Sequence, residues 1–265
     1  LRMSRGLGDV YKRQDLSNRF GNVWNRLCQE TQNSLVSGMT LWKAYKNIDD
    51  PNFDFSGICI LATSALENEL RKIFFEEFQE FVKNQTGGKI NRYPSIFTYR
   101  KGTELVAGKS EYFALGKMPF LFGQTGKDPS SEDLSDIKRL NDFREKYLES
   151  IIDSQKMIDS GFASFSECFT KPFFSKNSEL KKEKNFHVYY KGSLISEFED
   201  IRNKYRNKSA HQGGLRRDEA HDCCNLVFGS SIMGDNDLEK VLGLIQKVYY
   251  LLKPVSYTHL TLPTN

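Results

Sequence analysis

Residues 65–81 read ALENELRKIFFEEFQEF, and their spacing predicts an amphipathic helix. Apolar side chains recur every three or four positions with charged ones between them, which places the apolar set on one helix face. These apolar positions are Leu66, Leu70, Ile73, Phe74, Phe78 and Phe81. The intervening charges, Glu69 among them, are expected on the solvent side. We expect the helix to span about 56–84 and to stop near Gly87 and Gly88, because glycine tolerates the left-handed conformation that closes a helix.

The same periodicity predicts helices along most of the chain. They are expected at about 16–47, 131–158, 193–213, 216–229 and 235–253, and the helix at 193–213 is expected to begin at Ser193 or Ser196. The first region should face inward with Phe20, Trp24, Leu27, Leu35, Met39 and Trp42. Two irregular stretches, 89–129 and 160–192, interrupt the helices, and we expect the aromatic side chains of the first to cover a flank of the core. The basic run around 181–184 is expected to be a solvated loop.

Both ends of the chain read as translated sequencing adapter. Residues 9–14, DVYKRQ, correspond to the codons GAT GTG TAT AAG AGA CAG of a transposon end, and residues 255–264 correspond to the reverse-complement adapter. We therefore expect 1–14 and 255–265 to lie outside the fold. The two ends contain four basic residues and one acidic residue, and without them the formal net charge falls from +4 to +1. A nearly neutral chain does not support nucleic-acid binding through overall charge, so any such site must be local.

The remaining composition is that of an ordered protein. The 20 Phe and 12 Tyr residues argue against disorder, and no apolar run is long enough to span a membrane. The odd number of cysteines, without regular spacing, predicts reduced thiols and a cytoplasmic location. We predict an N-terminal helical region at 15–50 and a helical domain at 51–254 that carries an insertion at about 85–129.

The candidate catalytic residues are Arg206, Asn207 and His211, near the end of the helix predicted from Ser193. Arginine can hold a phosphate in bidentate fashion, and histidine exchanges a proton near neutral pH. At about 100° per residue, Arg206 lies on the border of the apolar face, whereas Asn207 and His211 lie together on nearly the opposite face. Arg202, one turn earlier on the same border, is the candidate for a further substrate contact. The helix C-terminus favours the imidazolium form of His211.

With these residues the chain resembles the HEPN superfamily. Members carry an arginine and a histidine separated by four to six residues near the end of a late helix, often with a polar residue after the arginine, and Arg206, Asn207 and His211 match this pattern. The early helix with ALENELR at 65–71 and the two helices at 215–252 are also similar, so the resemblance covers about 50–254. It implies an all-α fold, a four-helix bundle with an extra helix, which is often a homodimer. The irregular, aromatic-rich insertion departs from the smallest members.

The resemblance also implies an activity. HEPN proteins are frequently metal-independent endoribonucleases of toxin–antitoxin, antiphage or CRISPR-linked systems. We therefore expect RNA as the substrate, no cofactor or metal, no membrane association, a homodimer, and an antitoxin or a fused domain as a possible partner. The alternative is a non-catalytic helical interaction or sensor module of a larger defence or regulatory protein.

Other residues offer weaker alternatives. Arg216 and His221 also have four residues between them, but the place after the arginine is taken by Arg217 rather than a neutral polar residue. His221 with Cys223 and Cys224 suggests a metal site, although no second pair of ligands is apparent, so buried thiols and a surface histidine are preferred. His187 lies in FHVYY, which is typical of a short strand.

Overall fold

The computed structural model describes residues 12–87, 115, 118, 142–171, 193–211, 214–230 and 242–254. Most of these residues are helical, and the extended pairing among them is limited to two isolated antiparallel bridges, Ile152 with Leu252 and Gly229 with Leu242. The predicted all-α class is thus confirmed. His187, the basic run at 181–184 and nearly all of the insertion lie outside the described residues, and so does the predicted start of the helix at 131.

The N-terminal region is helical but broken. A helix at 12–20 continues into the 3₁₀ helix η1 (Gly21–Arg26), and α2 (Gln29–Tyr45) follows after a break. The six predicted inner positions are all buried, which confirms that face. The break occurs because Cys28 is extended, with ψ of 157°, and donates its N–H to Glu69 Oε1 at 2.7 Å. The helix at 12–20 begins inside the range assigned to adapter, and its first buried residue is Leu16.

The helix that the spacing in residues 65–81 predicts is continuous, as expected. It consists of α3 (Ser56–Arg71), a single π-helical turn η2 (Lys72–Glu76) and α4 (Glu77–Thr86), and it ends at Gly87 with φ of +66°. The solvent position predicted for Glu69 is wrong. This side chain is 1% exposed, and its carboxylate accepts the N–H of Cys28 and the hydroxyl of Tyr249. A buried carboxylate is tolerated here because it receives these two hydrogen bonds.

The helix predicted at 131–158 is interrupted. The described part runs over 142–151, and α7 (Ser154–Asp159) starts anew, with the Asp153 side chain accepting the N–H groups of Gln155 and Lys156. The Asp153 N–H donates to the carbonyl of Leu251, at the end of another helix, so a tertiary hydrogen bond replaces the helical one. The short helix α8 (Glu167–Thr170) lies in the second stretch that was expected to be irregular.

The last helices are α9 (Leu194–Ile201), the π turn η9 (Arg202–Arg206), α10 (Asn207–His211), α11 (Arg217–Phe228) and α13 (Leu244–Leu251). The first three form one continuous helix, here called the motif helix. α11 agrees with its predicted range. α13 begins at Leu244, because Leu242 bridges to Gly229 and Gly243 is extended with ψ of 164°; the predicted start of this helix at 235 lies outside the described residues.

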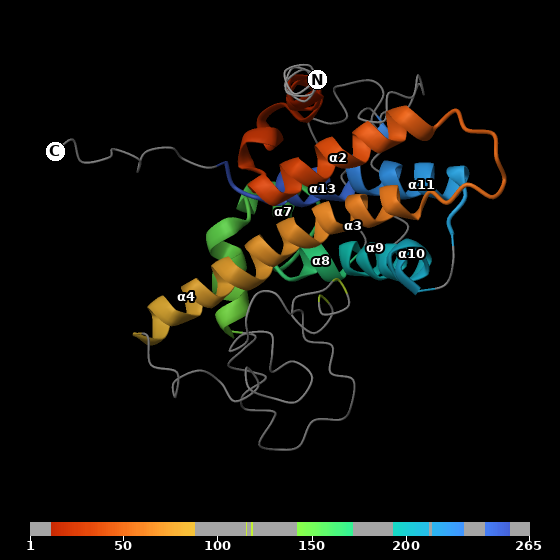
Figure 1. The fold of residues 1–265 in the computed structure, drawn as a ribbon. Helices are drawn as coiled ribbons and strands as arrows, with labels where there is room; N and C mark the ends of the chain where they lie inside the picture. The colour runs from red at the N-terminus through yellow and green to blue at the C-terminus, as the bar shows by residue number, and fades with distance from the viewer. Residues whose placement is uncertain are drawn as a thin grey trace.

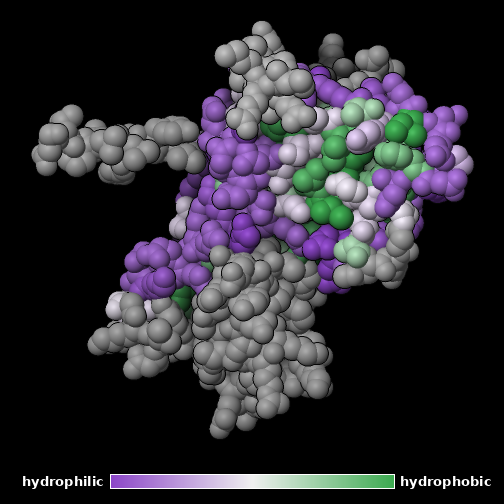
Figure 2. Space-filling view, viewed as in Figure 1, coloured by the Kyte–Doolittle hydropathy of each residue, from purple (hydrophilic) through white to green (hydrophobic). Residues whose placement is uncertain are grey.

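α3 is the centre of the arrangement. α2 lies along it, α11 and α13 lie behind, and the motif helix passes beneath it and contacts it through η9 and α10 (Figure 1). These helices enclose one apolar core. Among the described residues, no helix is both long enough and apolar enough to cross a membrane. Figure 2 shows an apolar area on the side where α2 and α3 face the viewer, and Ile60 of α3 is 37% exposed.

Candidate functional site

The motif helix starts where the sequence predicts. Ser193 is its N-cap and accepts the N–H of Ser196 at 3.2 Å, which satisfies one of the free donors at the helix start. Leu194, Ile195 and Phe198 are at most 3% exposed, so this part of the helix is fixed to the core. The candidate residues, which follow on the next turns, are therefore carried by a well-anchored helix.

A π turn separates this anchor from the candidate residues. The N–H of Asn207 donates to the carbonyl of Arg202, five residues earlier, so the turn contains one more residue than an α-helical turn. A helical wheel at 100° per residue does not include this extra residue, and the faces must be read from the structure. Tyr205 is half-buried, and burial raises its pKa to about 12. π turns inside α-helices occur frequently at functional sites.

Arg206 faces α3, where it meets Glu67. Arg206 Nε lies 3.7 Å from Glu67 Oε2, and the two side chains are 35% and 17% exposed. The Nε atom itself is buried and has no hydrogen-bond partner among the described residues. The exposed surface of Arg206 therefore belongs to other atoms of the side chain. Glu67 Oε1 accepts the N–H of Leu115 at 3.2 Å, which restrains the carboxylate that faces the arginine.

The remaining predicted residues lie on the same helix, before and after Arg206, and no contact of theirs with this pair is seen among the described residues. Arg202 is half-buried, and its Nε donates to Asn203 Oδ1 at 3.1 Å. Asn207 is exposed, as the wheel predicts. His211 is the last residue of α10, one helical turn beyond Asn207, but its side chain lies outside the described residues. A contact between Asn207 and His211 therefore stays a prediction.

The chain that leaves the motif helix is fixed to the start of α3. Asp54 Oδ1 accepts the N–H groups of Ser56 at 2.8 Å and Leu215 at 3.1 Å, and the Leu215 carbonyl accepts the N–H of Phe55 at 2.9 Å. Hydrogen bonds from Ser56 and Leu215 lower the pKa of Asp54. Lys208 of α10 also pairs with Glu219 of α11 at 2.5 Å.

Gly214 follows the motif helix, at a place where glycine ordinarily closes a helix by adopting a left-handed conformation. It is not among the glycines with positive φ, so that reason is wrong for this residue; Gly213 lies outside the described residues. Glycine is required at position 214 because there is no room for a side chain: a Cβ atom there would lie 2.9 Å from Asp54 Oδ1.

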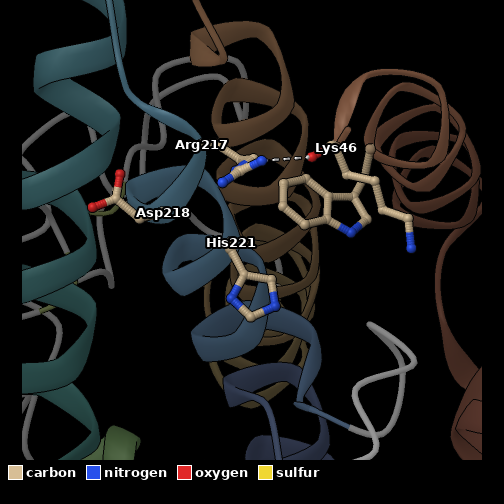
Figure 3. A pocket seen from close by; sticks show the side chains of 5 residues that line it. Lys46, Arg217, Asp218 and His221 are labelled. Atoms are coloured by element: carbon tan, nitrogen blue, oxygen red, sulfur yellow. Dashed lines mark hydrogen bonds between the residues drawn. The ribbon is translucent and has the colours of Figure 1, made fainter. Parts of the chain in front are cut away.

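The competing pair, Arg216 and His221, is not gathered into one site. Arg216 is exposed and pairs with Asp218 at 3.4 Å and with Glu219 at 3.7 Å. His221 instead stacks on Trp42 of α2, with ring centroids 5.3 Å apart. It lines a surface pocket of about 260 Å³ with Trp42, Lys46, Arg217 and Asp218, four residues that were not singled out as site residues (Figure 3).

The cysteines next to His221 are core residues. Cys223 and Cys224 are at most 1% exposed, and all five cysteines of the chain are free thiols. Burial raises the pKa of Cys224 well above its ordinary value, which disfavours the thiolate that binds metals. The described residues contain no group of three His, Cys, Asp or Glu side chains positioned to hold a metal ion.

Comparisons with known proteins add no family to this geometry. No protein-family model matches the chain, no curated protein matches it, and no solved structure matches it.

Proposed function

We propose that this chain is an endoribonuclease of the HEPN type, with Arg206, Asn207 and His211 as its catalytic residues. The observation that carries the proposal is the environment of Arg206. Its buried Nε has no hydrogen-bond partner among the described residues, and a restrained carboxylate lies 3.7 Å away. An arginine held in this way at the end of an anchored helix suits the recognition of a phosphate, which needs a guanidinium of fixed direction.

The reaction needs only RNA and protein side chains. The 2′-hydroxyl of the substrate attacks the adjacent phosphorus, the new P–O2′ bond forms, and the bond from phosphorus to the 5′-oxygen breaks. One proton leaves the 2′-hydroxyl and one is delivered to the departing 5′-oxygen, so the products are a 2′,3′-cyclic phosphate and a 5′-hydroxyl. His211 exchanges these protons, Arg206 stabilises the charge on the phosphate oxygens, and Asn207 orients His211 or the phosphate. DNA lacks the nucleophile and is not a substrate.

The proposal includes a homodimer. One histidine does not readily act as base and acid at the same moment, whereas two subunits supply two histidines and two arginines to one phosphate. The exposed apolar side chain of Ile60 supports a partner subunit on the side of α3 that carries Glu67, because Ile60 lies two helical turns before Glu67 on that helix. Toxin–antitoxin or antiphage defence is the context that such an activity suits, with an antitoxin or a fused domain as a further partner.

A non-catalytic interaction module is the second candidate. The ion pair between Arg206 and Glu67 also links the motif helix to α3, and this link stabilises a bundle whether or not RNA is cleaved. Activity of defined variants separates the two candidates.

The test is cleavage of single-stranded RNA by the full chain in excess EDTA. We expect a 2′,3′-cyclic phosphate product, no cleavage of DNA, and a loss of about 10²-fold or more in His211→Ala. Arg206→Ala should lose most activity, and Arg206→Lys should recover it only in part, because lysine lacks the bidentate geometry. Arg216→Ala is the matched control and should stay active. Unchanged cleavage by His211→Ala would exclude the assignment, and a folded wild type without activity would favour the interaction module.

Subunit mixing tests the shared site. Arg206→Ala and His211→Ala subunits, each inactive alone, should restore part of the activity when mixed, and light scattering should give the mass of a dimer. An active monomer would exclude the shared site but not the catalytic residues.

A further inference from the structure

The surface pocket lies between the end of α2 and the start of α11. Its volume of about 260 Å³ is below the roughly 300–1,000 Å³ of pockets that hold drug-sized ligands. The space suits a single small group, such as a phosphate with part of the nucleoside attached to it. The pocket is separate from the environment of Arg206, which does not line it.

The rim of the pocket carries two cations. Lys46 and Arg217 are both exposed, and neither has an ion pair with a carboxylate among the described residues. The Arg217 guanidinium donates to the Lys46 carbonyl at 3.5 Å, which keeps it beside the lysine. The acidic residue of the lining does not oppose them, since Asp218 is directed away from Arg217 in Figure 3 and pairs with Arg216 at 3.4 Å. The pocket therefore favours an anion.

The inner wall of the pocket is aromatic. The rings of Trp42 and His221 stack with an interplanar angle of 29°, and Trp42 is only 6% exposed, so the wall is held by the core. His221 is half-buried and presents a ring at the surface. Flat rings next to cations are the combination with which proteins bind single-stranded nucleic acid, because bases stack on the rings while the cations neutralise phosphates.

The pocket is at the same end of the bundle as the end of the motif helix. α10 and α11 are joined by the short segment 212–216, and Lys208 of α10 contacts Glu219 of α11 at 2.5 Å (Figure 1). We infer that the pocket holds a backbone phosphate of single-stranded RNA between Lys46 and Arg217. It is then a substrate subsite at the same end of the bundle as the cleavage site, and this inference rests on the proposed function. A free nucleotide carries the same chemical group, and the experiment below separates the two sources.

The test measures binding without cleavage. A short fluorescein-labelled 2′-O-methyl oligoribonucleotide lacks the hydroxyl nucleophile, so it stays intact while fluorescence anisotropy reports its affinity for the full chain. We compare wild type with Lys46→Ala/Arg217→Ala. The matched control is Lys83→Ala/Lys171→Ala, which removes two exposed positive charges that pair with Glu80 and Glu167 elsewhere.

The pocket variant should bind the oligonucleotide on the order of tenfold more weakly at about 0.1 M salt. The slope of log K against log salt should become shallower by about 0.7 for each phosphate charge no longer neutralised. The control should keep the wild-type slope. Adenosine monophosphate should displace the oligonucleotide only weakly, because it occupies one subsite of several. All variants should melt within a few degrees of wild type, since the altered side chains are exposed.

Three outcomes overturn the subsite: no binding of RNA by wild type, equal affinity and slope in the pocket variant and the control, or a monophosphate that binds as tightly as the oligonucleotide. Cleavage of unmodified RNA by the same proteins separates this failure from that of the proposed function. If the chain cleaves RNA but binds it independently of Lys46 and Arg217, only the subsite is refuted. If it binds RNA through the pocket without cleaving it, only the catalytic assignment is refuted.

Discussion

Glu67→Gln tests whether the ion pair with Arg206 positions a functional arginine or only joins two helices. Glutamine has the shape of glutamate but no charge, so the N–H of Leu115 still finds an acceptor. The guanidinium of Arg206 loses the carboxylate 3.7 Å from its Nε. The change therefore removes one electrostatic interaction and little else.

The expected loss of stability is small. Two unit charges about 4 Å apart interact by about 4 kcal/mol at an effective dielectric constant of about 20, but partly exposed pairs measured by mutation contribute roughly 0.2–1 kcal/mol. Arg206 is 35% exposed and Glu67 17%, so we expect a loss of about 1 kcal/mol or less in the free energy of unfolding. The melting temperature should fall by about 2–4 °C.

The expected loss of activity is larger. If the carboxylate directs the guanidinium at the phosphate, its removal should lower kcat for RNA cleavage by about tenfold or more with a smaller change in KM, because the arginine acts on charge that develops in the transition state. Glu76→Gln is the control, since Glu76 pairs with Arg71 at 3.6 Å on the same long helix. Cleavage within about twofold of wild type in Glu67→Gln, or an equal loss in Glu76→Gln, would refute the positioning role.

Three further changes probe the fold. Glu69→Ala removes the carboxylate that accepts from the buried Tyr249 hydroxyl and the part-buried Cys28 N–H, and should lower the free energy of unfolding by about 2–3 kcal/mol in urea denaturation; a loss below about 1 kcal/mol would contradict the buried network. In the folded protein the pKa of Asp54 lies below its ordinary value of 3.8. The ionised carboxylate, which accepts the N–H of Leu215, therefore stabilises the fold fully above pH 3.8, and this stabilisation is lost as the pH falls through the pKa of the folded state. Asp54→Asn should therefore be less stable than wild type at pH 7, and the difference should shrink toward about pH 2; a difference independent of pH would exclude this linkage. A chain of residues 15–254 should melt within a few degrees of the full chain by circular dichroism, and a large fall would show that the discarded ends belong to the fold.

The sequence by itself determined the features that depend on neighbouring residues. The apolar spacing around Leu66 and Leu70 predicts the buried face of α3, Gly87 ends the continuous helix after α4, and Ser193 caps the motif helix. Each of these follows from periodicity or from the backbone preference of one residue type, so a short window of sequence contains the cause. Asn207 is exposed as predicted, although the helical wheel behind that prediction did not include the extra residue of the π turn.

The tertiary structure alone decided where buried polar groups find partners. Nothing near Glu69 in the sequence indicates that Cys28 and Tyr249 come to its carboxylate, and solvent exposure is the ordinary expectation for a glutamate between apolar residues. The helix break at Asp153 has the same origin, because its N–H donates to Leu251 of another helix. Such hydrogen bonds join distant segments and become visible only when the helices pack.

The candidate site depends partly on local sequence and partly on contacts between helices. The residue types and spacing of Arg206 and Asn207 can be read from a short window of sequence. The π turn before Asn207 and the contact of Arg206 with Glu67 of α3 cannot, because they depend on how the helices pack. The pocket at Trp42 and His221 is likewise formed by two helices that only packing brings together. Local preferences thus place the motif on a helix, whereas the contacts between helices determine which charges face it.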